Sequence, residues 1–398
     1  MELVKKEMPG VFTLLGGHHA SAIPEHTLKT EPVDFVLQGE GYQPIVELLR
    51  AVKKGSREFN ITGIWYKDAK GNCVNNGSFL GSHKLDELPM VAWDMLPMEK
   101  YRAHHWQAWD YDLDTSRFAM IYTSLGCAFA CDFCSVNVVY GNRQVRFRSV
   151  EHVVAELKML VEQYQIRHVE VVDDTFTINA KRVEALCDCI IAAGLGDRLN
   201  MWCFGRTDTV EPGLMRKMKA AGFNWVFMGF ESGNDQILQS INKKQNTDKI
   251  KRANDIVRGA GIRVGGNYIF CHQEDTPETM QDTLELAKLL NVEYANFFLT
   301  MPYPGTNLYR IAQEKGYPLP EKWGQYGFFA PDAMPLRNKH LTSWDIIQFR
   351  DKAFNEYYQS ASYQEMVREV FGEKILAFLK EKVLSKEMVR RPPPQAML

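Results

Sequence analysis

The feature that most constrains the fold is a regular alternation of strand-like and helix-like segments between residues 118 and 315. Six apolar runs have strand character: FAMIYTS, HVEVVD, LNMWCFG, WVFMGF, VGGNYIF and YANFFLT. Helical patterns separate them, near 149–164, 180–193, 211–221, 247–260 and 277–290. This alternation is typical of parallel βα units. Six units rather than eight predict an α/β fold, a partial (β/α)6 TIM-type barrel that is open on one side. In such barrels the chemistry takes place at the carboxyl ends of the strands.

The segments around this core, which we place at 117–315, predict further regions. Residues 1–80 hold two apolar strand candidates, VFTLLGG and DFVLQGEG, an amphipathic helix, IVELLRAVKKG, and a hairpin around DAKGN. They predict an incomplete Rossmann-like α/β domain, because buried parallel strands need neighbours. Residues 81–116 are interpreted as a linker packed on the next domain. Residues 316–390 are predicted to be helical, and 391–398 to be a disordered tail.

Composition excludes several classes of function. The net charge is −2 at pH 7, so there is no overall basic field to attract nucleic acid. No apolar run has the length of a transmembrane helix, and the first residues, MELVKKEMPG, lack the apolar centre of a signal peptide. The sequence therefore predicts a cytoplasmic protein that acts on a small molecule and binds neither nucleic acid nor membrane.

Three of the eight cysteines fall close together, directly after the first predicted strand. Cys127, Cys131 and Cys134 form a C-x3-C-x2-C pattern in the segment TSLGCAFACDFC. Thiolates suit iron–sulfur clusters or zinc, and both structural zinc and electron-transfer clusters need four protein ligands. The next cysteines, Cys187 and Cys189, lie far along the chain on different sides of a predicted helix. The pattern therefore indicates a cluster with one open iron, the alternative being a structural metal loop or three unrelated thiols.

An open iron is what the chemistry of S-adenosylmethionine (SAM) needs. The amino and carboxylate groups of SAM can chelate such an iron, and one electron from the cluster can break the sulfonium carbon–sulfur bond. The cofactors carry this chemistry, while the protein supplies position and excludes water. The cysteine pattern therefore predicts cleavage of SAM to a primary carbon radical, which then abstracts hydrogen from a substrate.

The cysteine pattern, with Phe133 before its last member, resembles the radical SAM superfamily. GGHHAS, followed by PE and DFVLQGEG, is similar to the closing part of the N-terminal cobalamin-binding domain of one subgroup. LDELPMVAWDMLPMEKY resembles the linker of that subgroup, and GFESGNDQIL and MPYPGTNLY resemble later barrel segments. The resemblance implies a [4Fe–4S] cluster on Cys127, Cys131 and Cys134, and SAM with its adenine near Phe133. It also implies an external electron donor such as flavodoxin or ferredoxin.

Polar residues at the ends of the second and third strands are candidate SAM contacts. The resemblance places Asp173 and Asp174 near the SAM amino group, which a carboxylate can bind; the alternative is capping of the next helix. Arg206 can pair with the SAM carboxylate in a bidentate fork. The alternative is an ion pair within the loop, where Asp208 follows.

The later strand ends hold weaker candidates. Glu231 and Ser232 lie between glycines in GFESG, which suits close approach of a ligand to the backbone, and the resemblance places them near SAM; the alternative is a turn. Thr306 is interpreted as either part of a cavity-lining loop or a helix N-cap. Cys271 is a hydrogen-atom donor, a cluster contact or a small buried hydrophobe, and the last is favoured.

Two further groups of residues are given an ordinary structural interpretation or left open. Arg143, Arg146 and Arg148 are interpreted as a solvated basic loop, because charge runs usually are. The aromatic residues around Trp106 and Trp109 either line a cavity or serve as linker packing.

The first region departs from the cobalamin-binding pattern. Gly16 and Gly17 match its last signature, but the first two signatures, which would lie upstream of Met1, and a D-x-H-x-x-G motif are absent. Either the start is truncated or misassigned, or the chain is a natural variant whose remaining strands serve only as a cap. The predicted function is that of a radical SAM enzyme acting on an unactivated carbon of a metabolite. Methyl transfer through cobalamin, and radical cyclisation or rearrangement without it, both stay open. The competing hypothesis is a non-catalytic metal-binding or partner-binding protein on a degenerate scaffold.

Overall fold

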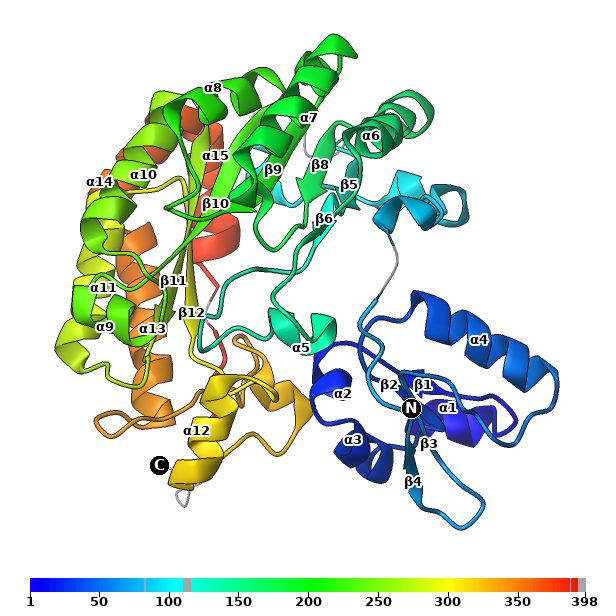
Figure 1. The fold of residues 1–398 in the computed structure, drawn as a ribbon. Coiled ribbons are helices and arrows are strands. Elements are labelled where there is room, and N and C mark those ends of the chain that lie inside the picture. Colours follow the sequence, from blue (N-terminus) through cyan, green and yellow to red (C-terminus); the bar gives the residue numbers. More distant parts are fainter. Residues whose placement is uncertain (82–83, 110–115, 387, 393–398) are drawn as a thin grey trace. The chain divides into compact units, whose positions relative to one another are not determined.

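A computed structural model describes residues 1–81, 84–109, 116–386 and 388–392 (Figure 1). The chain divides into two compact units, and each unit is assembled from separate stretches of sequence. Unit 1 comprises residues 1–83, 126–145 and 302–316. Unit 2 comprises residues 84–125, 146–301 and 317–398. These units do not follow the predicted linear boundaries, because the cysteine loop and the loop after the last core strand belong with the N-terminal residues.

Unit 1 contains a four-stranded sheet in the order β1-β2-β3-β4. β1 and β2 are parallel, and β3 and β4 form the predicted antiparallel hairpin with its turn at Asp68. The strands are β1 (Leu14–Leu15), β2 (Phe35–Leu37), β3 (Ile64–Lys67) and β4 (Cys73–Asn75). The helices are α1 (Glu2–Glu7), α2 (His18–Ala22), α3 (Pro24–Thr30), α4 (Tyr42–Lys53), α5 (Val136–Tyr140) and α12 (Asn307–Lys315).

β2 is buried on both faces, as its continuous apolar sequence predicts. Phe35 and Leu37 pack on one side with α4 residues such as Leu48. Val36 packs on the other side with Leu28 of α3. Burial on both sides makes β2 the centre of this unit's core.

Unit 2 contains a six-stranded parallel sheet in the order β12-β11-β10-β9-β8-β5. Its strands are β5 (Phe118–Ile121), β8 (His168–Val171), β9 (Asn200–Gly205), β10 (Phe223–Glu231), β11 (Arg263–Phe270) and β12 (Tyr294–Leu299). The six strands lie side by side in chain order, and a separate antiparallel pair, β6 (Ser124–Leu125) and β7 (Arg146–Phe147), falls between β5 and β8 in the sequence. The predicted partial barrel with six βα units is confirmed.

Helices cover one face of this sheet (Figure 1). They are α6 (Val150–Tyr164), α7 (Ala180–Ala192), α8 (Pro212–Ala220), α9 (Asp235–Ser240), α10 (Thr247–Gly259) and α11 (Pro277–Leu290). The predicted helical C-terminal region contains α13 (Ser343–Tyr358), α14 (Ala361–Phe371), α15 (Glu373–Leu379) and a π-helical turn, η8 (Lys380–Leu384). Residues 393–398 of the predicted tail lie outside the described residues. None of the described helices is both long and apolar enough to span a bilayer.

Short 3₁₀ turns fill the connections, and four of them lie in the predicted linker. These are η1 (Leu85–Glu87), η2 (Trp93–Met95), η3 (Met98–Lys100), η4 (His105–Ala108), η5 (Phe176–Ile178), η6 (Gly196–Arg198) and η7 (Trp323–Tyr326). The linker packs on the rest of unit 2. Trp93 and Met98 are buried, Trp93 is hydrogen-bonded to α6, and Asp86 is hydrogen-bonded to the N-terminus of that helix.

The opposite face of the six-stranded sheet, called here the inner face, is filled at one end by aromatic rings. Trp106 contacts the rings of Trp202, Trp225, Phe227 and Tyr294, with centroids 4.9–5.8 Å apart. Aromatic pairs at such distances are favourable beyond the area they bury. Trp106 therefore packs the barrel interior, which decides between the two interpretations of this linker aromatic in favour of packing.

Candidate functional site

The three cysteines lie on a loop of unit 1 that begins at a glycine with a left-handed backbone. Gly126 has φ +94°, and a Cβ there would lie 2.3 Å from the Gln144 carbonyl oxygen, so only glycine fits. Cys127 and Cys131 are half-buried and Cys134 is exposed. The Cys134 backbone N–H donates to the Cys131 carbonyl at 3.1 Å, which closes a turn between the last two cysteines.

Contacts on both sides hold this loop in place within unit 1. The Asn137 side chain donates to the Phe129 carbonyl at 3.0 Å, and the Leu308 N–H of α12 donates to the Asp132 carbonyl at 3.3 Å. α5, which follows the cysteines, packs against α2. Gly305 has φ +83°, and a Cβ there would lie 2.8 Å from Val138. The loop is therefore supported by two segments that lie far away in the sequence.

The donor set fits an iron–sulfur cluster by its chemistry, since three thiols on one supported loop are accessible in part. Among the residues that the structure describes, no three histidine, cysteine or acidic side chains lie close enough together to hold a metal ion. The ligand role of Cys127, Cys131 and Cys134 thus stays a prediction from residue type and spacing. Phe133 is half-buried on the same loop, and its contact with adenine also stays a prediction.

Unit 2 places Asp173 at the end of β8, where it binds the end of the neighbouring strand β5. Its carboxylate accepts three hydrogen bonds of 2.6 Å, from the Thr123 N–H, the Thr123 hydroxyl and the Ser124 hydroxyl. Burial raises the pKa of the Asp173 carboxyl, although these hydrogen bonds act in the opposite direction. Asp173 therefore ties two strand ends together, whereas the adjacent Asp174 is exposed.

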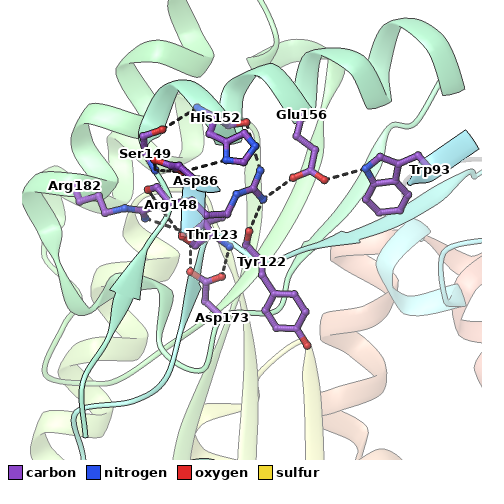
Figure 2. A network of polar contacts seen from close by, with 10 residues as sticks. All are labelled: Asp86, Trp93, Tyr122, Thr123, Arg148, Ser149, His152, Glu156, Asp173 and Arg182. Atoms are coloured by element: carbon purple, nitrogen blue, oxygen red, sulfur yellow. Dashed lines mark hydrogen bonds and ion pairs between the residues drawn. The ribbon is translucent and has the colours of Figure 1, made fainter. Parts of the chain in front are cut away.

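A wider polar network surrounds this connection (Figure 2). Arg182 of α7 donates to the Thr123 hydroxyl at 3.2 Å and to the Thr123 carbonyl at 2.9 Å. Arg148 donates to the Tyr122 carbonyl at 2.7 Å and to the Glu156 carboxylate at 2.6 Å, while the Tyr122 ring points away from the network. The interpretation of Arg148 as a solvated residue is wrong, because its charge is paired with the fully buried Glu156.

The ends of β9 and β10 are joined by a second buried network. The Arg206 guanidinium forms a bidentate pair with Asp208, at 2.9 and 3.2 Å, and donates to the Lys243 carbonyl at 2.9 Å. The ion pair within the loop, the alternative interpretation of Arg206, is therefore present in the structure. The Lys243 ammonium in turn lies 2.6 Å from the Glu231 carboxylate, and both side chains are buried.

The glycines of the GFESG segment make room for protein atoms. A Cβ at Gly229 would lie 2.2 Å from Glu231 Oε1 and 2.7 Å from Lys243 Nζ, so the ion pair occupies the space. A Cβ at Gly233 would lie 2.3 Å from the Asp282 carbonyl oxygen of α11. The ion pair and a helix therefore fill the side-chain positions of these glycines, and the approach of a ligand to the backbone stays a prediction.

Glu231 and Ser232 adopt an unusual turn at the end of β10. Glu231 has φ +63°, which non-glycine residues rarely adopt, and such strain is common at functional sites. Ser232 is fully buried, its hydroxyl 3.2 Å from the Thr283 hydroxyl of α11, and it accepts from the Asn234 N–H at 3.2 Å. The turn alternative thus describes both residues, and SAM contact stays a prediction.

The end of β11 is also buried and polar. Cys271 has φ +68°, and burial raises the pKa of its thiol, as expected of a small buried hydrophobe. The Asp275 carboxylate accepts 2.6 Å hydrogen bonds from the His272 N–H and the Thr279 hydroxyl. Burial raises the pKa of Asp275 to about 6 and lowers that of His272 to about 3.

The structure thus brings Arg206 and Glu231 together through Lys243, with Ser232 next in the chain. It separates Asp173 into its own network with Thr123 and Ser124. Thr306 is the N-cap of α12, where its hydroxyl accepts from the Tyr309 N–H at 3.2 Å, as one of its two interpretations had it. Sequence reasoning missed Lys243, and no motif signals it, because its link to Glu231 is visible only in three dimensions.

Comparisons with known proteins assign the family. Residues 121–287 match the model described as the radical SAM superfamily. An uncharacterized methyltransferase of Pyrococcus horikoshii is 33% identical over 362 residues, which are 90% of this chain and 74% of that protein. The chain belongs to the radical SAM superfamily and is an enzyme of that class.

Two further relatives match most of the chain but are themselves longer. The anaerobic magnesium-protoporphyrin IX monomethyl ester cyclase of Rubrivivax gelatinosus is 27% identical over 90% of this chain and 64% of its own length. The radical SAM methyltransferase TsrM of Kitasatospora setae, solved with cobalamin and a [4Fe–4S] cluster, matches with a TM-score of 0.63 and 18% identity. That match covers 80% of this chain and 61% of TsrM, and it supports the fold.

Unit 1 allows a test of whether cobalamin fits. Gly17 has φ +101° and open space at its Cβ position, as an approach of a ligand to the backbone requires. Among the described residues, however, β1 is an edge strand whose one neighbour is β2. A nucleotide crevice in a doubly wound sheet lies between strands on both sides of the first. The described residues supply one side of such a crevice, so they do not by themselves fit an enclosed cobalamin site.

Proposed function

We propose that the chain holds a [4Fe–4S] cluster on Cys127, Cys131 and Cys134, cleaves SAM reductively and functionalises an unactivated carbon of a metabolite. The observation that carries this proposal is the cysteine loop, which directly follows the first strand of the six-stranded parallel partial barrel. When bound, the cluster and SAM supply one-electron cleavage of a carbon–sulfur bond and hydrogen abstraction from the substrate. An external flavodoxin or ferredoxin is the proposed electron source.

The residues of the chain act by binding and positioning. Asp174, exposed beside the Asp173 connection, is the proposed acceptor for the SAM ammonium. Asp173 is a positioning residue in this proposal, because it fixes the β5 and β8 ends through Thr123 and Ser124. Arg206, Glu231 and Ser232 are proposed to shape the SAM site from the ends of β9 and β10. Their network holds this edge rigid, which favours a fixed geometry for bound cofactor.

The type of reaction is a finer proposal. Methyl transfer is favoured by the names of several relatives, which include a hopanoid C-3 methylase of Methylococcus capsulatus and the uncharacterized methyltransferase. Cyclisation is the second candidate, since the cyclase of Rubrivivax gelatinosus matches 90% of the chain. We derive no step through cobalamin, because unit 1 does not by itself enclose a site for it.

The experiment is anaerobic reconstitution of the full chain with iron, sulfide, SAM and dithionite, with and without cobalamin. We expect about four irons per chain, a spectrum that changes on addition of SAM, and production of 5′-deoxyadenosine. Serine replacement of Cys127, Cys131 or Cys134 should abolish that production. Cys189→Ser, on the half-buried face of α7, is the matched control and should retain it.

The result that would overturn the proposal is 5′-deoxyadenosine production that survives serine at Cys127, Cys131 or Cys134. Bound zinc, or a cluster whose spectrum does not respond to SAM, would favour the non-catalytic hypothesis instead. A tight stoichiometric complex with added cobalamin would support methyl transfer over cyclisation.

A further inference from the structure

An apolar cavity of about 480 Å³ lies within unit 2, between the predicted linker and the first strands of the sheet. Its volume is in the range of small-molecule sites. The linker contributes aliphatic and aromatic side chains, among them Leu88 and Val91. β5 and the residues after it contribute Phe118, Met120 and Tyr122. The SAM and cluster residues proposed above are absent from its lining.

The strand wall of the cavity belongs to the inner face of the sheet. Successive residues of β5 point to opposite sides. Ala119 and Ile121 are almost fully buried, whereas Met120 and Tyr122 are each 53% exposed. Phe118, on the same side as Met120, stacks on the Trp202 ring of β9 at 5.4 Å. The cavity therefore begins where the interior of the partial barrel reaches its edge strand, β5.

The linker wall is fixed at two points. The Asp86 carboxylate accepts from the Ser149 N–H at 2.9 and 3.1 Å, at the N-terminus of α6, and lies 3.0 Å from His152 Nδ1. The Trp93 indole donates to the Glu156 carboxylate at 2.9 Å, on the far side of the network in Figure 2. A wall held by hydrogen bonds to a helix is preformed, which lowers the entropy that a ligand must lose on binding.

The two basic side chains that line the cavity are already paired. Arg148 is bound to Glu156 and to the Tyr122 carbonyl, and His152 is bound to Asp86. An anionic ligand would have to compete with these carboxylates, so the site does not select for negative charge. The rest of the lining offers mostly carbon, and it includes the thioether side chains of Met90 and Met98, a residue type that adapts to irregular shapes.

We propose that this cavity binds the uncharged, apolar part of the substrate. That part is a flat ring system, or a branched hydrocarbon, about as large as two or three fused rings. The proposal rests on the proposed function, in that it names the substrate class of the same enzyme. An apolar occupant is stabilised in such a cavity because its surface leaves water. The bound occupant would present its carbon skeleton at the inner face of the sheet, where the partial barrel is open.

The test measures binding of a neutral fluorescent probe, phenylnaphthylamine, to the full chain without cluster or SAM. Wild type should bind it in the cavity. Met120→Lys on the strand wall and Val91→Lys on the linker wall should each weaken binding at least about tenfold, because a charge would have to lose its hydration. Ile191→Lys on α7, 43% exposed and outside the cavity, is the matched control and should bind as wild type does.

Three results would overturn the proposal: no binding by wild type, binding unchanged in both wall variants, or tighter binding of the anionic analogue anilinonaphthalene sulfonate. Circular dichroism shows whether each variant is folded, and the two wall variants lie on different elements, so misfolding of one leaves the other informative. Production of 5′-deoxyadenosine reports the proposed function separately. A wild-type chain that cleaves SAM but does not bind the probe would reject the cavity proposal alone.

Discussion

The strand ends of unit 2 bury their carboxylates in two different ways. At β10, Glu231 is paired with the ammonium of Lys243 at 2.6 Å. At β8 and β11, Asp173 and Asp275 have hydroxyl and backbone N–H donors as their hydrogen-bond partners. Burial raises the pKa of both aspartates. The same edge of one sheet therefore holds one carboxylate by charge and two by neutral donors.

The kind of hydrogen-bond partner determines where negative charge is fixed along the proposed site. An ion pair buried in a low dielectric is costly to break, because the partner left behind keeps its charge without compensation. A carboxyl held by neutral donors can take up a proton instead. Stability at β10 should therefore depend on the partner residue, and stability at β8 and β11 should depend on pH.

The largest effect is expected when the buried ion pair is broken. Lys243→Met should lower the free energy of unfolding by about 3–5 kcal/mol, because Glu231 would remain buried without a cation. Urea unfolding of the full chain measures it. Lys251→Met breaks an exposed pair with Asp248 on α10 and should cost less than about 1 kcal/mol. Equal effects of the two substitutions would show that the Glu231–Lys243 pair is not buried in solution.

The next effect is a dependence of stability on pH at the end of β11. The folded pKa of Asp275, about 6, lies above its ordinary value of 3.8. The contribution of Asp275 to the free energy of unfolding is therefore fully present below about pH 4 and is lost as pH rises through 6. The change amounts to about 3 kcal/mol. Asp275→Asn should flatten the unfolding free energy over this range, measured at steps of pH. Asp248→Asn, on an exposed side chain, should leave the slope as in wild type.

A smaller loss is expected at the end of β8. Asp173→Asn should cost about 1–3 kcal/mol at pH 7, because the amide turns a donor toward the Thr123 and Ser124 donors. Since burial raises the pKa of Asp173, this cost should be greater near pH 4 than at pH 7. The neighbouring exposed substitution, Asp174→Asn, should change stability by less than about 0.5 kcal/mol and weaken SAM binding instead. Isothermal titration with SAM distinguishes the positioning role of Asp173 from the SAM-binding role of Asp174. Loss of SAM binding in Asp173→Asn together with loss of stability in Asp174→Asn would exchange the two roles.

The smallest effect concerns a neutral hydrogen bond next to the ion pair. Ser232→Ala should cost about 1 kcal/mol, because the Thr283 hydroxyl and the Asn234 N–H lose a partner. Ser362→Ala, exposed on α14, should leave the unfolding midpoint unchanged. A loss at Ser232 as large as that at Lys243 would mean that hydrogen bonds rather than charge hold this strand end.

The strands and long helices of unit 2 could be predicted because their patterns are local. All six strands and the five predicted helices are present, with ends within a few residues of the apolar runs. The short helices α5 and α9 were not predicted, since five or six residues hold too little periodicity. The division into units was not predicted either, because the contacts of the cysteine loop with α2 and α12 join distant segments.

Candidate residues were easier to predict than their partners. Glu231, Arg206 and Asp173 are visible as polar residues after apolar strands, since the topology of parallel sheets places functional groups there. Their partners depend on tertiary structure. Lys243 follows Glu231 by 12 residues, and Thr123 precedes Asp173 by 50. The sequence therefore predicts at which edge of the sheet these polar residues lie but leaves open which charges neutralise each other.

The close packing at Gly229 implies a rule of inheritance for this strand end. A side chain at position 229 and the Glu231–Lys243 pair would occupy the same space. Position 229 can therefore gain a side chain in evolution only if the lysine, the glutamate or both change with it. Relatives that carry any larger residue at this position should also have lost the lysine, the glutamate or both, and an alignment of homologues would show the three columns varying together.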